Sequence, residues 1–172
     1  MFDFVRIACA VPEVEVGNTE FNTQEIIKYI DINKDADVVV FPELCVTGYT
    51  CADLFFQRTL IDGVKAGIAD IAKTTEGTNS VVAVGAPVII GGQLYNCAVL
   101  MSKGRVDGIS VKTFIPTYNE YYEKRWFSSA ADLKCTSICS DELGLDGEYE
   151  IPVGNNLVFD YSGVKISAEI CE

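Results

Sequence analysis

Two unbroken apolar runs constrain this chain more than any other feature. Residues 37–41 read Asp-Val-Val-Val-Phe and end at Pro42, and residues 80–90 form a longer run of the same kind. Strands that are apolar on both sides are typical of sheets with both faces covered. Between the two runs, isoleucine and valine recur at spacings of three and four, at Ile61, Val64, Ile68 and Ile71. This spacing predicts an amphipathic helix, so the first half should alternate strand and helix.

The rest of the chain fits an α/β fold with a mixed sheet. Residues 4–11 predict a first strand with Val5, Ile7, Cys9 and Val11 on one face, and Asn22 or Thr23 begins a helix with Ile26, Ile27 and Ile30 on its apolar side. Gly91-Gly92, Lys103-Gly104 and Ser162-Gly163 predict hairpin turns. The strands that these turns join are expected at residues 80–90, 94–101, 106–112, 157–161 and 164–171. Residues 114–133 are expected to be irregular, and the acidic, glycine-rich residues 135–152 are expected to form a surface loop.

Charge and hydropathy exclude several classes of function. The chain has 25 acidic and 13 basic residues, a net charge of −12, which repels nucleic-acid phosphates. Residues 77–102 carry no charge, but Pro87, the Gly-Gly pair and Asn96 interrupt them, so two strands explain the run better than a membrane span. The N-terminus has Asp3 where a signal peptide has basic residues. We expect a soluble, cytoplasmic protein that binds neither nucleic acid nor membrane.

The chain has seven cysteines and no histidine. An odd number of scattered cysteines suits reduced, mostly buried thiols rather than a disulfide framework. Cys135 and Cys139 lack a second pair of ligands, so no metal site is expected. Catalysis without histidine must use carboxylate, lysine, cysteine or tyrosine side chains.

Three reactive residues are expected at strand ends, where functional groups gather in α/β sheets. Glu43 follows the run that ends at Pro42, Lys112 ends one predicted strand and Cys171 ends another. A cysteine can attack an amide carbonyl as the thiolate, a lysine can stabilise the oxyanion and a glutamate can carry the proton. Each residue alone also has an ordinary interpretation: a buried thiol, a turn carboxylate and a solvated lysine.

Three sequence segments, which follow one another along the chain, favour the catalytic interpretation of these residues over the ordinary one. Phe41-Pro-Glu-Leu-Cys-Val-Thr-Gly-Tyr49, Lys112-Thr-Phe-Ile-Pro-Thr-Tyr-Asn-Glu120 and Ala168-Glu-Ile-Cys-Glu172 resemble the three signatures of the nitrilase superfamily. The residues from Glu43 to Phe55, and the Asn119-Glu-Tyr-Tyr-Glu-Lys-Arg-Trp-Phe127 stretch, further resemble the glutaminase domain of glutamine-dependent NAD synthetases. The resemblance spans nearly the whole chain.

The resemblance implies a fold, a reaction and a set of roles. The fold would be the α-β-β-α sandwich of nitrilases, incomplete at its C-terminal end, with residues 1–172 as the first part of the domain. Glu43 would be the general base, Lys112 the oxyanion-stabilising lysine and Cys171 the nucleophile. Glu120 would be a supporting glutamate. The glutamine pocket would be lined by Tyr49, Tyr118 and Glu123.

The same resemblance sets expectations about substrates and partners. The substrate would be glutamine, this domain would need no cofactor, and ATP and magnesium would bind a separate C-terminal synthetase domain. We also expect a homo-oligomer, and little activity from residues 1–172 alone. Another amidase or a carbamoylase with the same three residues is the alternative. A non-enzymatic nucleotide-binding or interaction domain is a third reading, without a G-x-G-x-x-G motif to support it.

Overall fold

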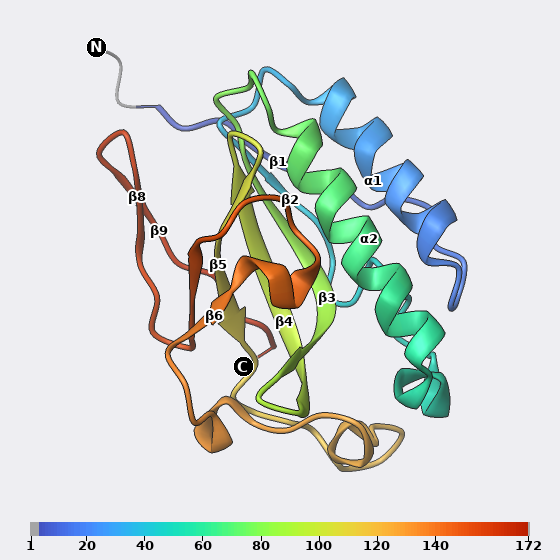
Figure 1. The fold of residues 1–172 in the computed structure, drawn as a ribbon. Helices are drawn as coiled ribbons and strands as arrows, with labels where there is room; N and C mark the ends of the chain where they lie inside the picture. Colours follow the sequence, from blue (N-terminus) through green and yellow to red (C-terminus); the bar gives the residue numbers. More distant parts are fainter. Residues whose placement is uncertain (1–3, 172) are drawn as a thin grey trace.

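A seven-stranded mixed sheet with two helices on one face forms the body of the molecule (Figure 1). The computed structural model describes residues 4–171, so Asp3 and Glu172, which enter the expectations above, lie outside it. The strands are β1 (Ile7–Cys9), β2 (Val38–Val40), β3 (Val81–Ile90), β4 (Gln93–Ser102), β5 (Arg105–Val111), β6 (Ser137–Cys139), β7 (Glu150–Gly154), β8 (Phe159–Tyr161) and β9 (Val164–Ile166). The helices are α1 (Thr19–Ile32) and α2 (Arg58–Thr74), with short 3-10 helices η1 (Ala52–Phe56), η2 (Glu123–Arg125), η3 (Ala130–Asp132) and η4 (Ser140–Leu143).

The order of strands confirms the predicted mixture of directions. In the sheet the order is β1-β2-β3-β4-β5-β7-β6. The first three strands are parallel, because α1 and α2 return the chain to the same edge between them. β3, β4 and β5 are antiparallel neighbours, and β5 and β7 are parallel. β8 and β9 pair only with each other.

The three predicted hairpin turns are confirmed. Gly91 and Gly92 have φ angles of 57° and 81°, and Lys103 and Gly104 have φ angles of 50° and 80°. The turn between β8 and β9 has the same form, with φ angles of 55° at Ser162 and 89° at Gly163. Left-handed backbone at both central residues matches the twist of the flanking strands, which is why glycine is placed at each of these turns.

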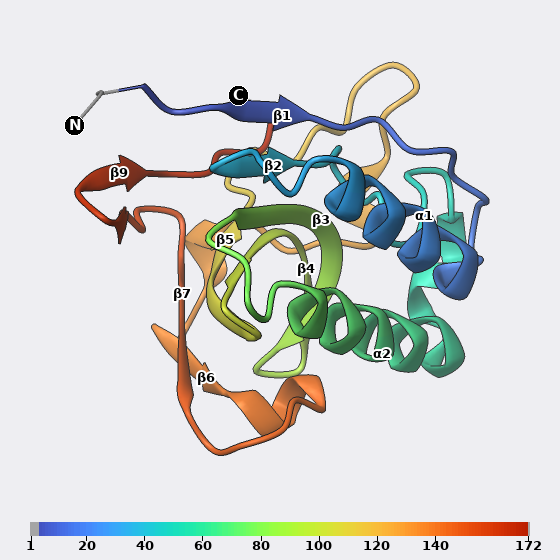
Figure 2. The same ribbon diagram turned by 90° about the horizontal axis from the view of Figure 1, so that it is seen from above.

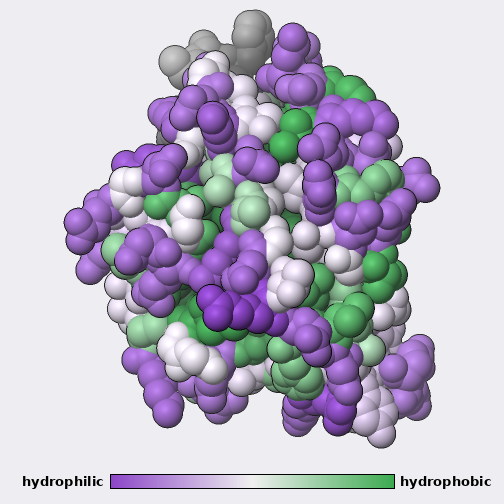
Figure 3. All heavy atoms as spheres, turned by 45° about the vertical axis from the view of Figure 1, so that its right-hand side comes forward, coloured by the Kyte–Doolittle hydropathy of each residue, from purple (hydrophilic) through white to green (hydrophobic). Residues whose placement is uncertain are grey.

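The hydrophobic core lies between the helices and the sheet. Ile26 and Ile30 of α1 and Ile68 of α2 pack against strand residues such as Val39 and Val84. All of these side chains are almost completely buried. The outer surface of the helices is mostly hydrophilic, with small hydrophobic areas between charged side chains (Figure 3). The helix periodicity seen in the sequence therefore identified the correct buried face of α2.

One predicted element boundary, the start of the first helix, shifts for a local reason. α1 begins at Thr19 rather than at Asn22 or Thr23, because the Asn18 side chain caps it by accepting a hydrogen bond from the Phe21 N–H at 3.2 Å. Asn22 and Thr23 are buried within the helix. The side chain of Asn22 instead donates to the carbonyl oxygens of Glu15 and Val46, which ties the helix to the loops beside it.

Residues 135–152 are not a surface loop, and this prediction was wrong. They contain β6, η4 and the start of β7, and they bury Ile138, Leu143 and Ile151 against the core. Acidic and glycine residues between these positions hid the apolar spacing. The pairing of β6 with β7 extends the sheet beyond β5.

The expected apolar face of the first strand is exposed. Val5, Ile7 and Val11 are exposed, as is Cys9, whereas Ala10 is buried. β1 is an edge strand, and its alternate residues point away from the helices. The expectation of mostly buried thiols is therefore wrong: Cys45, Cys51 and Cys97 are buried, whereas Cys9 and Cys171 are exposed and the remaining two are half-buried.

The chain after β7 turns to the side of the sheet opposite the helices (Figure 2). A side chain at Gly108 of β5 would collide with the ring of Phe159 in β8, and the Tyr161 hydroxyl donates to Asp107 at 2.8 Å. Residues 166–171 and the outward-facing residues of β2, β3 and β4 line one cavity of about 330 Å³. The end of the described chain thus lies over this face of the sheet.

Candidate active site

Glu43 is placed by a sharp turn at the end of β2. Phe41 still continues the ladder by donating its N–H to Ala83, and Val46 donates to the carbonyl of Gly85. Between these bonds the backbone bends through Leu44, whose φ angle is 52°. A side chain at Gly85 would collide with the backbone of Pro42 and Leu44, so the turn can lie against β3 only because this residue is glycine. The turn directs the carboxylate of Glu43 over the sheet edge.

Lys112 extends directly from β5 into the same region. Its N–H donates to the carbonyl of Asn96 at 2.9 Å, which continues the β4–β5 ladder by one residue. The side chain is only 1% exposed. Its Nζ donates to Oε1 of Glu43 at 2.6 Å and to both carboxylate oxygens of Glu123 at 2.8 and 3.0 Å. Lys112 is therefore a buried cation held between two carboxylates.

Glu123 completes this cluster from the loop after β5. It begins η2 and is almost completely buried. The Tyr49 hydroxyl donates to Oε1 of Glu123 at 2.6 Å. We call Glu43, Lys112, Glu123 and Tyr49 the charged cluster.

The environment of the cluster shifts two pKa values upward. Burial alone would lower the pKa of Lys112, but its hydrogen bonds to Glu123 and Glu43, with the charges of both, outweigh that effect and raise the pKa above 10.5. The pKa of Tyr49 is raised far above its ordinary value by burial, then by its hydrogen bond to Glu123 and by the charges of Glu123 and Glu43. Lys112 is therefore charged and Tyr49 is neutral at physiological pH.

An ion pair outside the cluster holds the loop that carries Glu123. Arg125 donates from Nε and Nη2 to the two oxygens of Asp53 at 2.6 and 2.7 Å, and Trp126 donates to the same carboxylate at 3.0 Å. The Arg125 guanidinium and the Trp126 donor hold the pKa of Asp53 well below its usual range. This two-pronged contact joins η2 to η1, which follows the Glu43 turn. Two loops that are distant in sequence are thereby fixed together.

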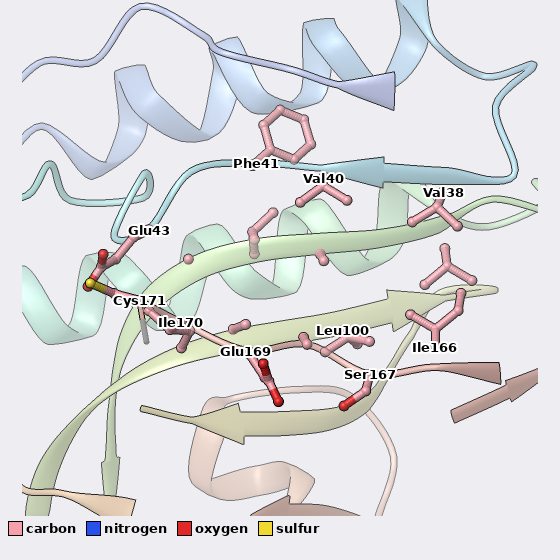
Figure 4. Close-up of a pocket in the computed structure, with 16 residues that line it drawn as sticks. Val38, Val40, Phe41, Glu43, Leu100, Ile166, Ser167, Glu169, Ile170 and Cys171 are labelled. Carbon is pink, nitrogen blue, oxygen red and sulfur yellow. The ribbon is translucent and has the colours of Figure 1, made fainter. Parts of the chain in front are cut away.

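Cys171 has no hydrogen bond to the charged cluster among residues 4–171, but it lines the same cavity as Glu43. Figure 4 places its sulfur at the end of the cavity where the Glu43 carboxylate lies. Cys171 does not end a strand, so that prediction was wrong: β9 stops at Ile166, opposite Phe159, because β8 offers no further residue to pair with. The thiol is exposed and the φ angle of Cys171 is 45°.

The structure brings Glu123, and not Glu120, to Lys112. Glu120 is exposed and has no ion pair or hydrogen bond among residues 4–171. The N–H of Glu123 donates to the carbonyl of Pro116, which folds the segment back so that Glu120 lies on its outer side. The position given to Glu120 in the sequence analysis is thus occupied by Glu123, which had been assigned only to a substrate pocket.

The predicted pocket tyrosines behave differently from each other. Tyr49 is bonded into the cluster, whereas Tyr118 is largely exposed and reaches it only through the Tyr121 ring. The centroid of Tyr121 lies 5.6 Å from that of Tyr118 and 6.5 Å from that of Tyr49. These rings form an aromatic rim beside the cluster.

Sequence reasoning missed two residues that contact the cluster or its loop. Asn96 is fully buried and donates to Glu43 at 2.6 Å, and Asp53 holds η2. A signal for Asn96 was present, because an amide inside an otherwise uncharged strand must find a buried partner. No comparable signal marks Asp53, whose partner is distant in sequence.

The arrangement suits chemistry at an amide or related carbonyl. A thiol beside a carboxylate can transfer its proton as the sulfur attacks, and a buried cation nearby stabilises the developing negative charge. With two carboxylates and one ammonium, the ionised cluster has an excess negative charge. Glu43 is the member of the cluster that lines the cavity with Cys171, which makes it the candidate proton acceptor.

The chain belongs to the carbon-nitrogen hydrolase family, which it matches over residues 6–172. This is the nitrilase-type fold that the sequence predicted. Among curated relatives, it is 31% identical to a glutamine-dependent NAD(+) synthetase of Mycobacterium leprae, over 98% of this chain and 25% of that protein.

Solved structures agree with this assignment. A glutamine-dependent NAD(+) synthetase from Cytophaga hutchinsonii is 28% identical and superposes with a TM-score of 0.82, covering 95% of this chain and 27% of that one. An amidase from Nesterenkonia sp. AN1 is only 18% identical, with a TM-score of 0.61 over 78% of this chain and 50% of that one, so it shows the shared fold alone.

The chain spans about a quarter of the length of the synthetases that it matches. In the part of the chain that the structure describes, no helix is long and apolar enough to cross a bilayer.

Proposed function

We propose that this domain is the glutaminase part of a glutamine-dependent NAD synthetase. It hydrolyses the side-chain amide of glutamine to glutamate and ammonia. A synthetase domain of the same parent protein then uses the ammonia, with ATP and magnesium, to amidate deamido-NAD. The observation that carries the proposal is the buried Lys112 between Glu43 and Glu123, together with the cavity that both Glu43 and Cys171 line.

The likeness to the synthetases favours this substrate over other amides. The synthetase relative is 31% identical over nearly the whole chain, whereas the amidase neighbour is 18% identical. The aromatic rim of Tyr49, Tyr121 and Tyr118 offers a surface beside the reactive groups on which a small polar substrate can lie. We place the enzyme in the cytoplasm, where seven free cysteines remain reduced, and expect a homo-oligomer.

The first half of the proposed reaction forms a thioester. The Cys171 sulfur attacks the amide carbon of glutamine while its proton passes to Glu43. The oxygen of the tetrahedral intermediate gains negative charge, which the field of Lys112 stabilises. The C–N bond then breaks, and Glu43 returns its proton to the leaving nitrogen, so that ammonia departs and an acyl group remains on sulfur.

The second half regenerates the enzyme. Glu43 takes a proton from a water molecule while the water oxygen attacks the thioester carbon. The C–S bond then breaks, and the Cys171 thiolate regains the proton from Glu43. Glutamate is released. Glu123 and Tyr49 do not exchange protons in this scheme; they hold Lys112, and with it Glu43, in place.

Covalent labelling tests the proposal. The parent protein is treated with a diazoketone analogue of glutamine and analysed by intact and peptide mass spectrometry. A single adduct on Cys171 is expected, prevented by excess glutamine. Cys45 is the internal control, because burial raises its pKa to about 12 and leaves it protonated and unreactive. Labelling of another cysteine instead of Cys171 would contradict the proposal.

The 172 residues alone provide a second test. We expect them to release little or no glutamate from glutamine, because Cys171 lies on exposed, irregular backbone. Turnover equal to that of the parent protein would show that these residues suffice for the site.

A further inference from the structure

Asn96 occupies the centre of the site and bonds to the groups around it. It lies on β4, is fully buried, and its backbone carbonyl accepts the hydrogen bond from the Lys112 N–H at 2.9 Å. Its Nδ2 donates to Oε1 of Glu43 at 2.6 Å and lies 3.4 Å from Oε2 of Glu123. One residue thus contacts all three charged members of the cluster.

The two side chains that donate hydrogen bonds to Glu43 bond to the same carboxylate oxygen. Lys112 Nζ and Asn96 Nδ2 both bond Oε1 at 2.6 Å. Among residues 4–171, no hydrogen bond reaches the other oxygen, Oε2. The Glu43 side chain is 25% exposed and lines the cavity into which Cys171 also points (Figure 4). One oxygen is therefore held and the other is available for proton transfer.

One atom of the buried Asn96 amide has no hydrogen-bond partner, and the contacts of the other explain why. Oδ1 of Asn96 is buried and has no hydrogen-bond partner in the described part of the chain. A buried acceptor without a partner destabilises the folded protein. The amide cannot turn over to relieve this, because carboxylates only accept hydrogen bonds and Oδ1 would then face them. The orientation is consequently dictated by Glu43 and Glu123.

We propose that Asn96 is a positioning residue that fixes Glu43 with Oε2 directed to the reacting thiol, and this inference rests on the proposed function. An amide suits the task because it donates a hydrogen bond without adding charge. A second cation here would hold Glu43 in its ionised form and weaken it as a base, whereas a third carboxylate would repel it. Asn96 therefore sets the geometry of the base without adding charge to the cluster.

The test uses the parent protein with Asn96→Ala, Asn96→Asp and, as a matched control, Ser110→Ala. Ser110 is also buried in the neighbouring strand β5 and also has a polar atom without a partner, and among residues 4–171 its side chain has no hydrogen bond to the cluster. Glutamate release is measured across pH to give kcat and KM, together with thermal unfolding and synthesis from added ammonia.

Asn96→Ala should lower kcat about 100-fold with little change in KM, because a misplaced base costs about that much. Asn96→Asp should also move the acidic limb of the pH profile to higher pH, since a third carboxylate disfavours the ionised form of Glu43. Ser110→Ala should leave kcat and the pH profile unchanged. All three variants should synthesise NAD from added ammonia at the wild-type rate.

Asn96 variants with wild-type kcat and pH profiles, in a wild-type protein that hydrolyses glutamine, would overturn this inference alone. Failure of both variants to fold would make Asn96 a structural residue and would overturn it as well. A wild-type protein that releases no glutamate would overturn the proposed function, and the inference with it.

Discussion

The two halves of the candidate site are built in opposite ways. Within the charged cluster Lys112 and Glu123 are buried, and short hydrogen bonds link them to Glu43 and Tyr49 from the loop after β2. Cys171 lies on exposed backbone outside any strand. In the proposed mechanism the contrast separates two tasks: the sheet fixes the proton acceptor and the cation in advance, whereas the segment after β9 supplies the nucleophile. Substitutions in the two halves should therefore affect stability and activity differently.

The largest expected effect on activity comes from Cys171→Ala. Glutamine-dependent synthesis by the parent protein should fall to background, because the bond to the substrate can no longer form. Synthesis from added ammonia should be unchanged, and so should thermal unfolding, since the side chain is exposed. Parallel assays with glutamine and with ammonium salt measure this. Loss of both activities would mean that Cys171 has a structural role.

The largest expected effect on stability comes from Lys112→Met. Removing the cation leaves Glu43 and Glu123 facing each other in a mostly buried place, which costs about 3–5 kcal/mol. Urea unfolding of this variant beside Cys171→Ala measures the contrast between the two halves. Equal stability of the two variants would contradict the expected difference between the charged cluster and the Cys171 segment.

Glu123→Gln and Glu120→Gln form a matched pair on one segment. Glu123→Gln should reduce kcat about 100-fold, because Lys112 loses its principal partner and shifts relative to Glu43. Glu120→Gln should have almost no effect, since that carboxylate is exposed and lies outside the cluster. Glutamate release by the two parent-protein variants decides the assignment, and a larger effect at Glu120 would restore the assignment made from the sequence.

Tyr49→Phe should have a smaller effect. The substitution removes one hydrogen bond to Glu123 and keeps the ring, so it should cost about 1 kcal/mol of stability. Chemical unfolding beside Tyr118→Phe provides the control, because Tyr118 is largely exposed. Equal losses from the two substitutions would show that the Tyr49 hydroxyl contributes nothing specific.

The smallest effect concerns pH. The pKa of Lys112 is raised in the folded state, so its stabilising contribution is present in full below its ordinary pKa of 10.5 and is lost as pH rises through the higher folded value. The stability difference between wild type and Lys112→Met should thus be constant from about pH 7 to about pH 9 and shrink only above 10.5. Urea unfolding across this range tests it, and a decline near neutral pH would contradict the raised pKa.

The sequence by itself determined the alternation of strands and helices and the three hairpins. These are local properties, because apolar periodicity and glycine turns depend on neighbouring residues. Glu43 and Lys112 follow apolar runs whose ends the sequence marks, and the structure brings them within 2.6 Å of each other. The order of the three signatures was likewise visible without coordinates.

Only the tertiary structure decided which side chains complete the cluster. Glu120 and Glu123 are three residues apart on an irregular segment, and the backbone bond to Pro116 determines which of them turns inward. Asn96 and Asp53 act through partners 53 and 72 residues away. The strand pairing that stops at Ile166 determines where Cys171 lies. Such contacts depend on the packing of distant segments, which no local pattern of residues encodes.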